Sequence, residues 1–146
     1  MSLIRNDKAH LDYEFLEKME AGLELVGAEV KTLRAGRGSL KGARVLARGG
    51  ECYLVGASIP AWQIANAGDF DPERPRRLLL SKKEIAQVAS AEAQKGLTIV
   101  PISVYSKGRQ LKLEIVIARG KKKADKREDL KKRDEKRNIE RALKQR

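Results

Sequence analysis

The sequence has few of the groups from which metal sites and catalytic centres are built. It contains one histidine, His10, and one cysteine, Cys52. A lone cysteine forms no intramolecular disulfide, and a structural zinc site needs about four Cys or His ligands. No GxxxxGK[ST] or GxGxxG motif for phosphate binding is present either. The residues therefore predict a protein that is not an enzyme, with no catalytic residue, no metal and no cofactor.

Long apolar runs and aromatic residues are scarce as well. No stretch approaches the ~20 apolar residues that span a membrane, and the start, MSLIRNDKAHLDYEF, has no apolar core of signal-peptide length. With the single cysteine, these features predict a cytoplasmic protein with no membrane partner. Aromatic residues are 4% of the chain, too few for a broad platform that stacks bases. Recognition of the backbone and shape of a nucleic acid fits better.

Positive charge is what the sequence has in excess. The chain carries 32 Lys and Arg against 20 Asp and Glu, a formal net charge of +12. Residues 120–146 hold thirteen of these basic residues and six of the acidic ones. Basic residues therefore outnumber acidic ones both in this segment and in residues 1–119. Such a surplus predicts a polyanionic partner, nucleic acid before an anionic membrane.

The composition divides the chain into a body, residues 1–119, and a basic C-terminal tail, residues 120–146. The tail has three large apolar residues, too few to offset the roughly 1–2 kcal/mol of backbone entropy lost per ordered residue. Its acidic residues still favour a helix, because Asp125 and Glu128 form a capping pattern and acids precede bases at i, i+4. We expect the tail to be mostly unfolded when free and helical when bound.

The first half of the body predicts a strand, a helix and a hairpin. Residues 13–25 fit a strand with a bulge at Ala21–Gly22. The next segment is a short helix that ends at Gly36. Gly49–Gly50 is a two-residue turn signal for a hairpin. Apolar spacing places three residues on the inner face of the helix and two on one face of the hairpin's second strand: Val26, Val30, Leu33, Cys52 and Leu54.

The second half predicts a loop rich in proline over residues 59–77, then a helix and two strands. Ser81 and Glu84 form a capping box for the helix, and Gly96 closes it. The strands, 97–105 and 110–118, are joined around Gly108, and Pro101 should lie at an edge or a bulge. The fold class is therefore mainly β, an OB-type antiparallel barrel of about six strands with two or three flanking helices.

Several segments together resemble a known family. NDKAHLDYEF, EAGLELVGAEVKTLRAGR, DPERPRRLLLSKKEI, GLTIVPISVY and IARGKKKADKRED occur in the order found in the SmpB family, the bacterial small protein B that binds transfer-messenger RNA, or SsrA RNA. The resemblance covers nearly the whole chain from Asn6 onward. Two positions depart from the family pattern: Asp7 stands where a basic residue is usual, and Ala124 where His or an aromatic residue is common.

The resemblance implies a role in trans-translation. Similar proteins bind the tRNA-like domain of transfer-messenger RNA and stand in for its missing anticodon arm. Their tail becomes helical in the vacant messenger channel of a stalled ribosome, and peptide transfer then moves the nascent chain to the alanine on the RNA. The implied partners are transfer-messenger RNA, the ribosome with its A site and ribosomal RNA, and, indirectly through the aminoacylated RNA, elongation factor Tu.

The resemblance also implies which residues make these contacts. The RNA-binding set, carried over by position, is Asn6, Glu20, Lys31, Arg34, Arg77 and Leu79. The ribosome-binding set in the tail is Gly120, Lys121, Lys122, Asp125, Lys126 and Arg127. The basic members of the first set would contact phosphates, whereas Glu20 would accept from a base edge, a sugar hydroxyl or a neighbouring Arg. Gly120 is expected to be a hinge.

Two other functions stay open at this point. A generic basic OB-type RNA-binding or ribosomal module would lose affinity as salt rises and show little preference among structured RNAs. An enzyme that cleaves or modifies RNA would turn its substrate over, but the sequence offers no candidate chemistry for it.

Overall fold

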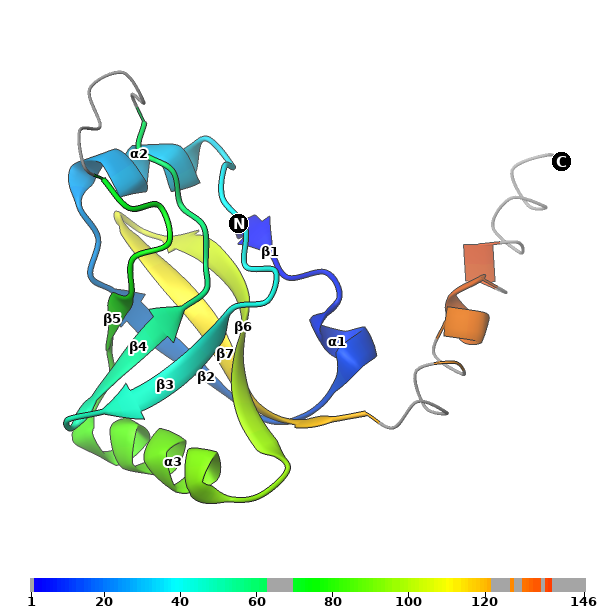
Figure 1. Cartoon of the computed structure of the whole chain (residues 1–146). Coiled ribbons are helices and arrows are strands. Elements are labelled where there is room, and N and C mark those ends of the chain that lie inside the picture. Colours follow the sequence, from blue (N-terminus) through cyan, green and yellow to red (C-terminus); the bar gives the residue numbers. More distant parts are fainter. Residues whose placement is uncertain (1, 63–69, 122–126, 128–129, 135, 138–146) are drawn as a thin grey trace, which may run out of the picture.

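The computed structural model describes residues 2–62, 70–121, 127, 130–134, 136 and 137. Its elements follow one another along the chain (Figure 1) as β1 (Ser2–Arg5), α1 (Ala9–Asp12), β2 (Tyr13–Leu23), α2 (Gly27–Arg34), β3 (Arg44–Arg48), β4 (Glu51–Val55), β5 (Arg76–Leu79), α3 (Lys82–Ala93), β6 (Leu97–Lys107) and β7 (Gln110–Gly120). The loop predicted over 59–77 is confirmed for residues 59–62 and 70–75, but it was wrong at its end, because Arg76 and Arg77 belong to β5.

One antiparallel sheet of seven strands forms the body, in the order β1-β6-β7-β2-β5-β4-β3. The sheet curls until β3 packs against β6, so β3, β4 and β5 face β6, β7 and β2 across one interior (Figure 1). The predicted barrel is thus confirmed. It has seven strands, against about six expected, and two of them were not predicted from the sequence. The four residues of β1 pair with the C-terminal half of β6, and β5 pairs with β2 and β4.

Alternation along β7 separates the core from the outer face, as predicted. Leu111, Leu113, Ile115 and Ile117 point into the main core. The outward residues Val116 and Ala118 are buried too, because they form a second, smaller cluster with Val100, against which Tyr13, Phe15 and Ile102 pack. Only the half of the outer face beyond that cluster, around Lys112 and Glu114, stays accessible.

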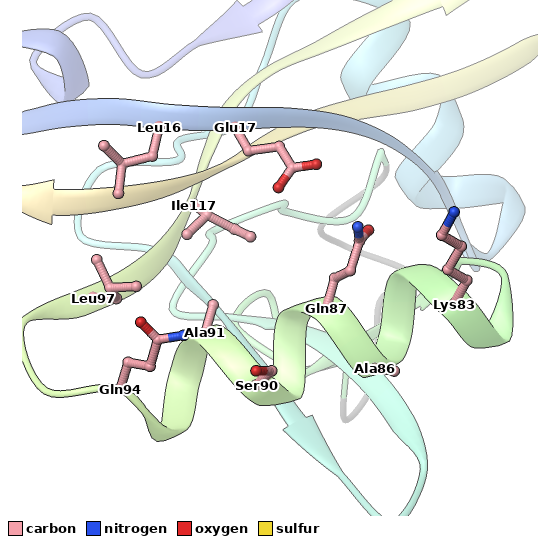
Figure 2. Close-up of a pocket in the computed structure, with 10 residues that line it drawn as sticks. All are labelled: Leu16, Glu17, Lys83, Ala86, Gln87, Ser90, Ala91, Gln94, Leu97 and Ile117. Atoms are coloured by element: carbon pink, nitrogen blue, oxygen red, sulfur yellow. The ribbon is translucent and has the colours of Figure 1, made fainter.

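The bulge in β2 is not where the sequence suggested. The register shifts between Phe15 and Glu17, whereas Ala21 and Gly22 pair regularly with β7. Gly22 is instead a point of close approach, because a Cβ added there would lie 3.1 Å from Leu79 Cβ. The bulge turns Leu16 outward, where it lines an open hollow of about 560 Å³ between β2 and α3 (Figure 2).

Pro101 occupies a bulge, as predicted. The register between β6 and β7 shifts between Pro101 and Ser103. Asn6 covers this irregular point, since its backbone N–H donates to the carbonyl of Ile102 at 2.7 Å and its Nδ2 donates to that of Pro101 at 3.0 Å.

The turn signals were mostly right. Gly49 and Gly50 have φ of 58° and 77° and join β3 to β4 as a two-residue hairpin turn. Gly36, with φ of 76°, follows the end of α2. The predicted capping box of α3 is present, but Gly96 does not close that helix, which ends at Ala93. Gly96 lies instead in the turn before β6.

The expectation for the inner face of α2 was partly wrong. Val26 is 49% exposed and precedes the helix, while the carboxylate of Glu29 is fully buried. Apolar spacing could not reveal this, because the group that α2 buries is charged. Cys52 and Leu54 share the buried face of β4 as predicted.

Two arginines surround the buried carboxylate of Glu29. Arg76, also fully buried, donates from Nε to Glu29 Oε2 at 2.8 Å. Arg74 donates to both carboxylate oxygens, and the backbone N–H of Val26 donates to Oε1 at 3.0 Å. The other nitrogens of Arg76 donate to the carbonyls of Ala57, Ile59 and Pro72. The network therefore joins α2, the loop after β4 and the start of β5.

The body extends slightly beyond residue 119. Gly120 is a strand residue opposite Tyr13, and the N–H of Lys121 donates to the carbonyl of Asp12 at 2.8 Å. Gly120 is therefore held in the sheet and is not the hinge that we expected. In the tail, Arg127 and residues 130–134, 136 and 137 are helical and exposed. Lys122, Ala124, Asp125, Lys126 and Glu128 lie outside the described residues.

The described residues include no helix long and apolar enough to cross a membrane. Over the same ranges, no group of three or more His, Cys, Asp or Glu side chains could hold a metal ion.

The Glu29→Gln variant tests the buried network. It leaves the charge of Arg76 uncompensated in the interior, so we expect a loss of about 3–5 kcal/mol in the free energy of unfolding at pH 7, measured by urea denaturation. Glu24→Gln, which removes an exposed ion pair, should cost less than about 1 kcal/mol. Equal losses of unfolding free energy in the two variants would contradict the stabilising role of the buried Glu29 network.

The difference in unfolding free energy between wild type and Glu29→Gln should depend on pH in a known direction. Burial alone would raise the pKa of Glu29, but hydrogen bonds from Arg74, Val26 and Arg76 outweigh it and hold the pKa below its usual value. A lowered folded-state pKa stabilises the protein above the unfolded pKa, about 4.3, and that contribution disappears as pH falls through the folded value. The gap between wild type and Glu29→Gln should therefore narrow below about pH 4.

Candidate nucleic-acid interface

A row of cross-strand neighbours runs over the accessible half of the outer face. Leu79 of β5 lies opposite Gly22 of β2, Gly22 lies opposite Lys112 of β7, and Lys112 lies opposite Tyr105 of β6. Neighbours in such a row have Cβ atoms about 5 Å apart. The sheet thereby gathers side chains from β5, β7 and β6 onto one surface, with the backbone of Gly22 in β2 between them.

Leu79 marks a hollow at one end of this row. Its side chain is 50% exposed, so it is an outward residue and not part of the core. Together with Gly22, Val30, Arg109 and Lys112 it lines a hollow of about 300 Å³ between the sheet and α2. A Cβ at position 22 would press on Leu79, so glycine there keeps the leucine close to the sheet. The lining of the hollow thus combines apolar side chains with the basic side chains of Arg109 and Lys112.

Glu20 lies one row away and is surrounded by hydrogen-bond donors. Tyr105 Oη donates to its carboxylate, and Lys107 Nζ lies 3.1 Å from Oε1. The hydrogen bond from Tyr105, followed by that from Lys107, lowers the pKa of Glu20. Burial, followed by the hydrogen bond to Glu20, raises the pKa of Tyr105. Glu20 is therefore ionised at neutral pH, and it orients one hydroxyl and one ammonium on the outer face.

Asn6 lies near a second hollow on the same face. This hollow, of about 310 Å³, is lined by Arg5, Asn6, His10, Ser103 and Glu114 among others. Glu114 is the cross-strand partner of Glu20, so the hollow adjoins the Glu20 group. The amide of Asn6 is itself bonded to the bulge at Pro101. Asn6 therefore shapes this part of the surface as much as it lines it.

The helix α2 brings two further candidates. Lys31 and Arg34 are exposed on it, and Arg34 Nη2 donates to the carbonyl of Arg109 at 2.9 Å. This contact ties the C-terminal part of α2 to the turn between β6 and β7, at the edge of the hollow that Leu79 lines. Arg34 and Arg109 thus contribute positive charge beside that hollow.

Arg77 is already paired in the free protein. It alternates with buried Arg76 and Leu78 along β5, and its guanidinium lies 2.7 Å from Glu24 and 3.6 Å from Glu51. The hydrogen bond to Glu24 is the main reason that the pKa of Arg77 is raised. A phosphate that contacts Arg77 would have to replace these carboxylates.

The structure gathers most of the predicted RNA-binding set on one side of the barrel. Glu20 and Leu79 lie on the shared outer face, Arg34 is tied to its edge, and Asn6 lines the adjoining hollow. Sequence reasoning missed four residues of this surface: Tyr105, Lys107, Arg109 and Lys112. The alternation of β7 could have found Lys112, because it lies between two core leucines. The other three depend on strand pairing that no local pattern encodes.

The chain matches the family model described as SmpB protein over residues 3–145. Similar proteins include the SsrA-binding protein of Thermosipho africanus, 48% identical over 95% of this chain and 94% of the relative. The SsrA-binding protein of Gloeobacter violaceus is 47% identical over 97% and 93%, and that of Solidesulfovibrio magneticus is 49% identical over 94% and 90%.

A solved structure described as "tmRNA-SmpB: a journey to the center of the bacterial ribosome" is also similar. It is 39% identical, with a TM-score of 0.70, and the match covers 86% of this chain and 92% of that chain. Sequence and structure thus point to the same set of relatives.

Glu24→Gln should strengthen RNA binding by releasing Arg77. An exposed ion pair contributes about 0.2–1 kcal/mol, so we expect affinity for the tRNA-like domain of transfer-messenger RNA, measured by fluorescence anisotropy, to rise by a factor of about 1.4 to 5. Glu14→Gln removes the same charge near the other end of β2 and serves as the control. An equal rise in both variants would show that net charge alone is responsible.

Proposed function

The chain belongs to the SmpB protein family, and on this premise we propose that it binds transfer-messenger RNA and acts as the adaptor of trans-translation on stalled ribosomes. The observation that carries the proposal is the extent of the match, which includes both the barrel and the basic tail, residues 3–145. Relatives named SsrA-binding protein cover the chain almost completely. A protein built only as a generic basic barrel would have no reason to share the tail.

In this proposal the body recognises the tRNA-like domain. The outer face around Glu20, Leu79 and Lys112 is the contact surface, since it combines an apolar hollow with positive charge. Arg34 and Lys31 of α2 and, after partner exchange, Arg77 contact phosphates. Glu20 holds Tyr105 and Lys107 in place and so acts mainly by orienting donors toward the RNA. Asn6 fixes the bulge at the far end of the surface.

The tail is assigned to the ribosome. Lys121 leaves the barrel from a fixed point beside Asp12, and the described residues after it are helical with exposed side chains. We assign to the tail entry into the vacant messenger channel, with the ribosome-binding set Gly120, Lys121, Lys122, Asp125, Lys126 and Arg127. Its surplus of bases suits a channel lined by ribosomal RNA, while its acids favour a helix over an extended arm.

The remaining partners and the setting follow from this role. Elongation factor Tu is reached through the aminoacylated RNA and not through a dedicated surface of this chain. The site of action is the cytoplasm, where ribosomes work. The chain itself acts as an adaptor and is assigned no catalytic step, because the ribosome supplies peptide transfer.

The proposal is tested first by a competition gel shift at physiological salt. The tRNA-like domain of transfer-messenger RNA competes with an ordinary tRNA for the full chain and for a version that ends at Lys121, whose N–H is bonded to the barrel. Selective binding by both versions supports recognition by the body. Equal affinity for the two RNAs, or loss of binding on truncation, would identify a generic basic module instead.

Changing Asp125, Lys126 and Arg127 together to Ala should leave RNA binding intact and abolish peptide transfer to transfer-messenger RNA. The reason is that the three residues follow the barrel in the sequence and belong to the part assigned to the messenger channel. The measurement is tagging of a nascent chain on ribosomes stalled at the end of a truncated message. The triple change of Asp134, Lys136 and Arg137 to Ala removes the same residue types from the same tail and should retain transfer. Normal tagging by the first variant would refute the role of the tail.

A further inference from the structure

Trp62 is the single tryptophan of the chain, and it is 39% exposed. It lies in the loop after β4. The guanidinium of Arg37 lies over its ring, with Cζ 5.6 Å from the ring centroid. This is within the ~6 Å at which a cation and an aromatic face attract. A large aromatic ring is thus kept at the surface with a positive charge beside it.

The loop that carries Trp62 is anchored to α2. The hydroxyl of Thr32, which is buried, lies 2.7 Å from the carbonyl of Pro60, two residues before the indole. Ser39 and Ser58 exchange a pair of backbone hydrogen bonds of 2.8 and 2.9 Å. These contacts hold the segment of Arg37 and the segment of Trp62 side by side.

The backbone of the segment that carries Arg37 is also held in place. The N–H of Arg37 donates to the carbonyl of Thr32 at 3.1 Å. Gly38 has φ of 129°, and a Cβ there would come within 3.2 Å of Ser58 O. Only glycine therefore allows the two segments to approach so closely. The pair of Arg37 and Trp62 is set in place before any ligand arrives, which reduces the entropy lost on binding.

The position of the pair favours RNA. Arg37 follows Arg34 by three residues, directly beyond the helix whose exposed basic residues we assign to phosphates. An aromatic ring next to phosphate-binding cations is the arrangement that binds unpaired bases, because the ring stacks the base while the cations hold its backbone. The aromatic content excludes a broad platform, but one ring suffices for one base.

We propose that the exposed indole of Trp62, held beside Arg37, stacks an unpaired nucleobase of the bound RNA. The inference rests on the proposed RNA-binding function and makes it more specific. A stacking ring needs a base that is free of its helix, so it selects RNA with unpaired loop bases over uniform duplex. Trp62 thereby adds selectivity to a surface whose other contacts are mainly electrostatic.

Tryptophan fluorescence tests the inference, because all indole emission of the protein comes from Trp62. The full chain is titrated with the tRNA-like domain RNA and with a blunt RNA duplex of equal length, while a gel shift follows binding. Quenching that saturates together with binding of the first RNA, and is absent on binding of the duplex, supports the stack. Binding of the first RNA without quenching overturns the stack and leaves the proposed function standing. Absence of binding in the gel shift overturns the proposed function itself.

Two substitutions separate stacking from a structural role. Loss of a base–aromatic stack weakens binding roughly 5- to 150-fold, so Trp62→Leu should lose this much affinity for the tRNA-like domain and little for the duplex. Trp62→Phe keeps an aromatic face and should retain most of the affinity. Leu16→Ala, which removes another exposed apolar side chain, 45% exposed, is the control and should change neither. Equal loss for both RNAs in Trp62→Leu, or equal loss in the Leu and Phe variants, would overturn the stacking assignment.

Discussion

A buried carboxylate is the constraint on which the rest of the structure depends. Taking the charge of Glu29 out of water costs several kcal/mol unless its partners are in place, and those partners lie on other segments. The helix α2 can therefore dock only when β5 and the loop after β4 are correctly positioned. Successive side chains of a strand point to opposite faces. Because Arg76 points into the interior, Arg77 and Leu79 point to the outer face. One interior network thus sets the relative position of two elements that carry most of the proposed RNA contacts.

Several cations of the outer face already form ion pairs within the protein. Arg77 is occupied by Glu24, and Lys107 by Glu20. Occupied cations attract an arbitrary polyanion less strongly than free ones, which limits non-specific binding despite the net charge of +12. A ligand that supplies phosphates in the right geometry recovers the lost ion pairs. Specificity can then arise from shape, through the hollow beside Leu79, together with charge.

The elements that could be predicted from the sequence are those determined by residues close together in the chain. The capping box of Ser81 and Glu84 and the hairpin turn at Gly49–Gly50 are determined by residues close in sequence, and both are present. The buried Glu29 could not be foreseen, since periodicity counts apolar residues and its partners are about 45 residues away. For the same reason the bulge was assigned to Gly22, whose actual role is contact with Leu79 of another strand. The candidate RNA-binding residues were predicted from family resemblance, whereas the hydrogen-bond donors around Glu20 could be found only from the strand register.

The hydrogen bond between Lys121 and Asp12 gives the tail a fixed origin on the barrel. From residue 122 to the end of the chain there are 25 residues, which as a continuous helix would span about 38 Å at 1.5 Å per residue. In the proposed function, origin and length together set how far from the barrel each tail residue can act. Each inserted residue would advance every later side chain by about 1.5 Å and rotate it by about 100°. The number of residues between the barrel and a tail residue therefore determines where that side chain lies, independently of its charge.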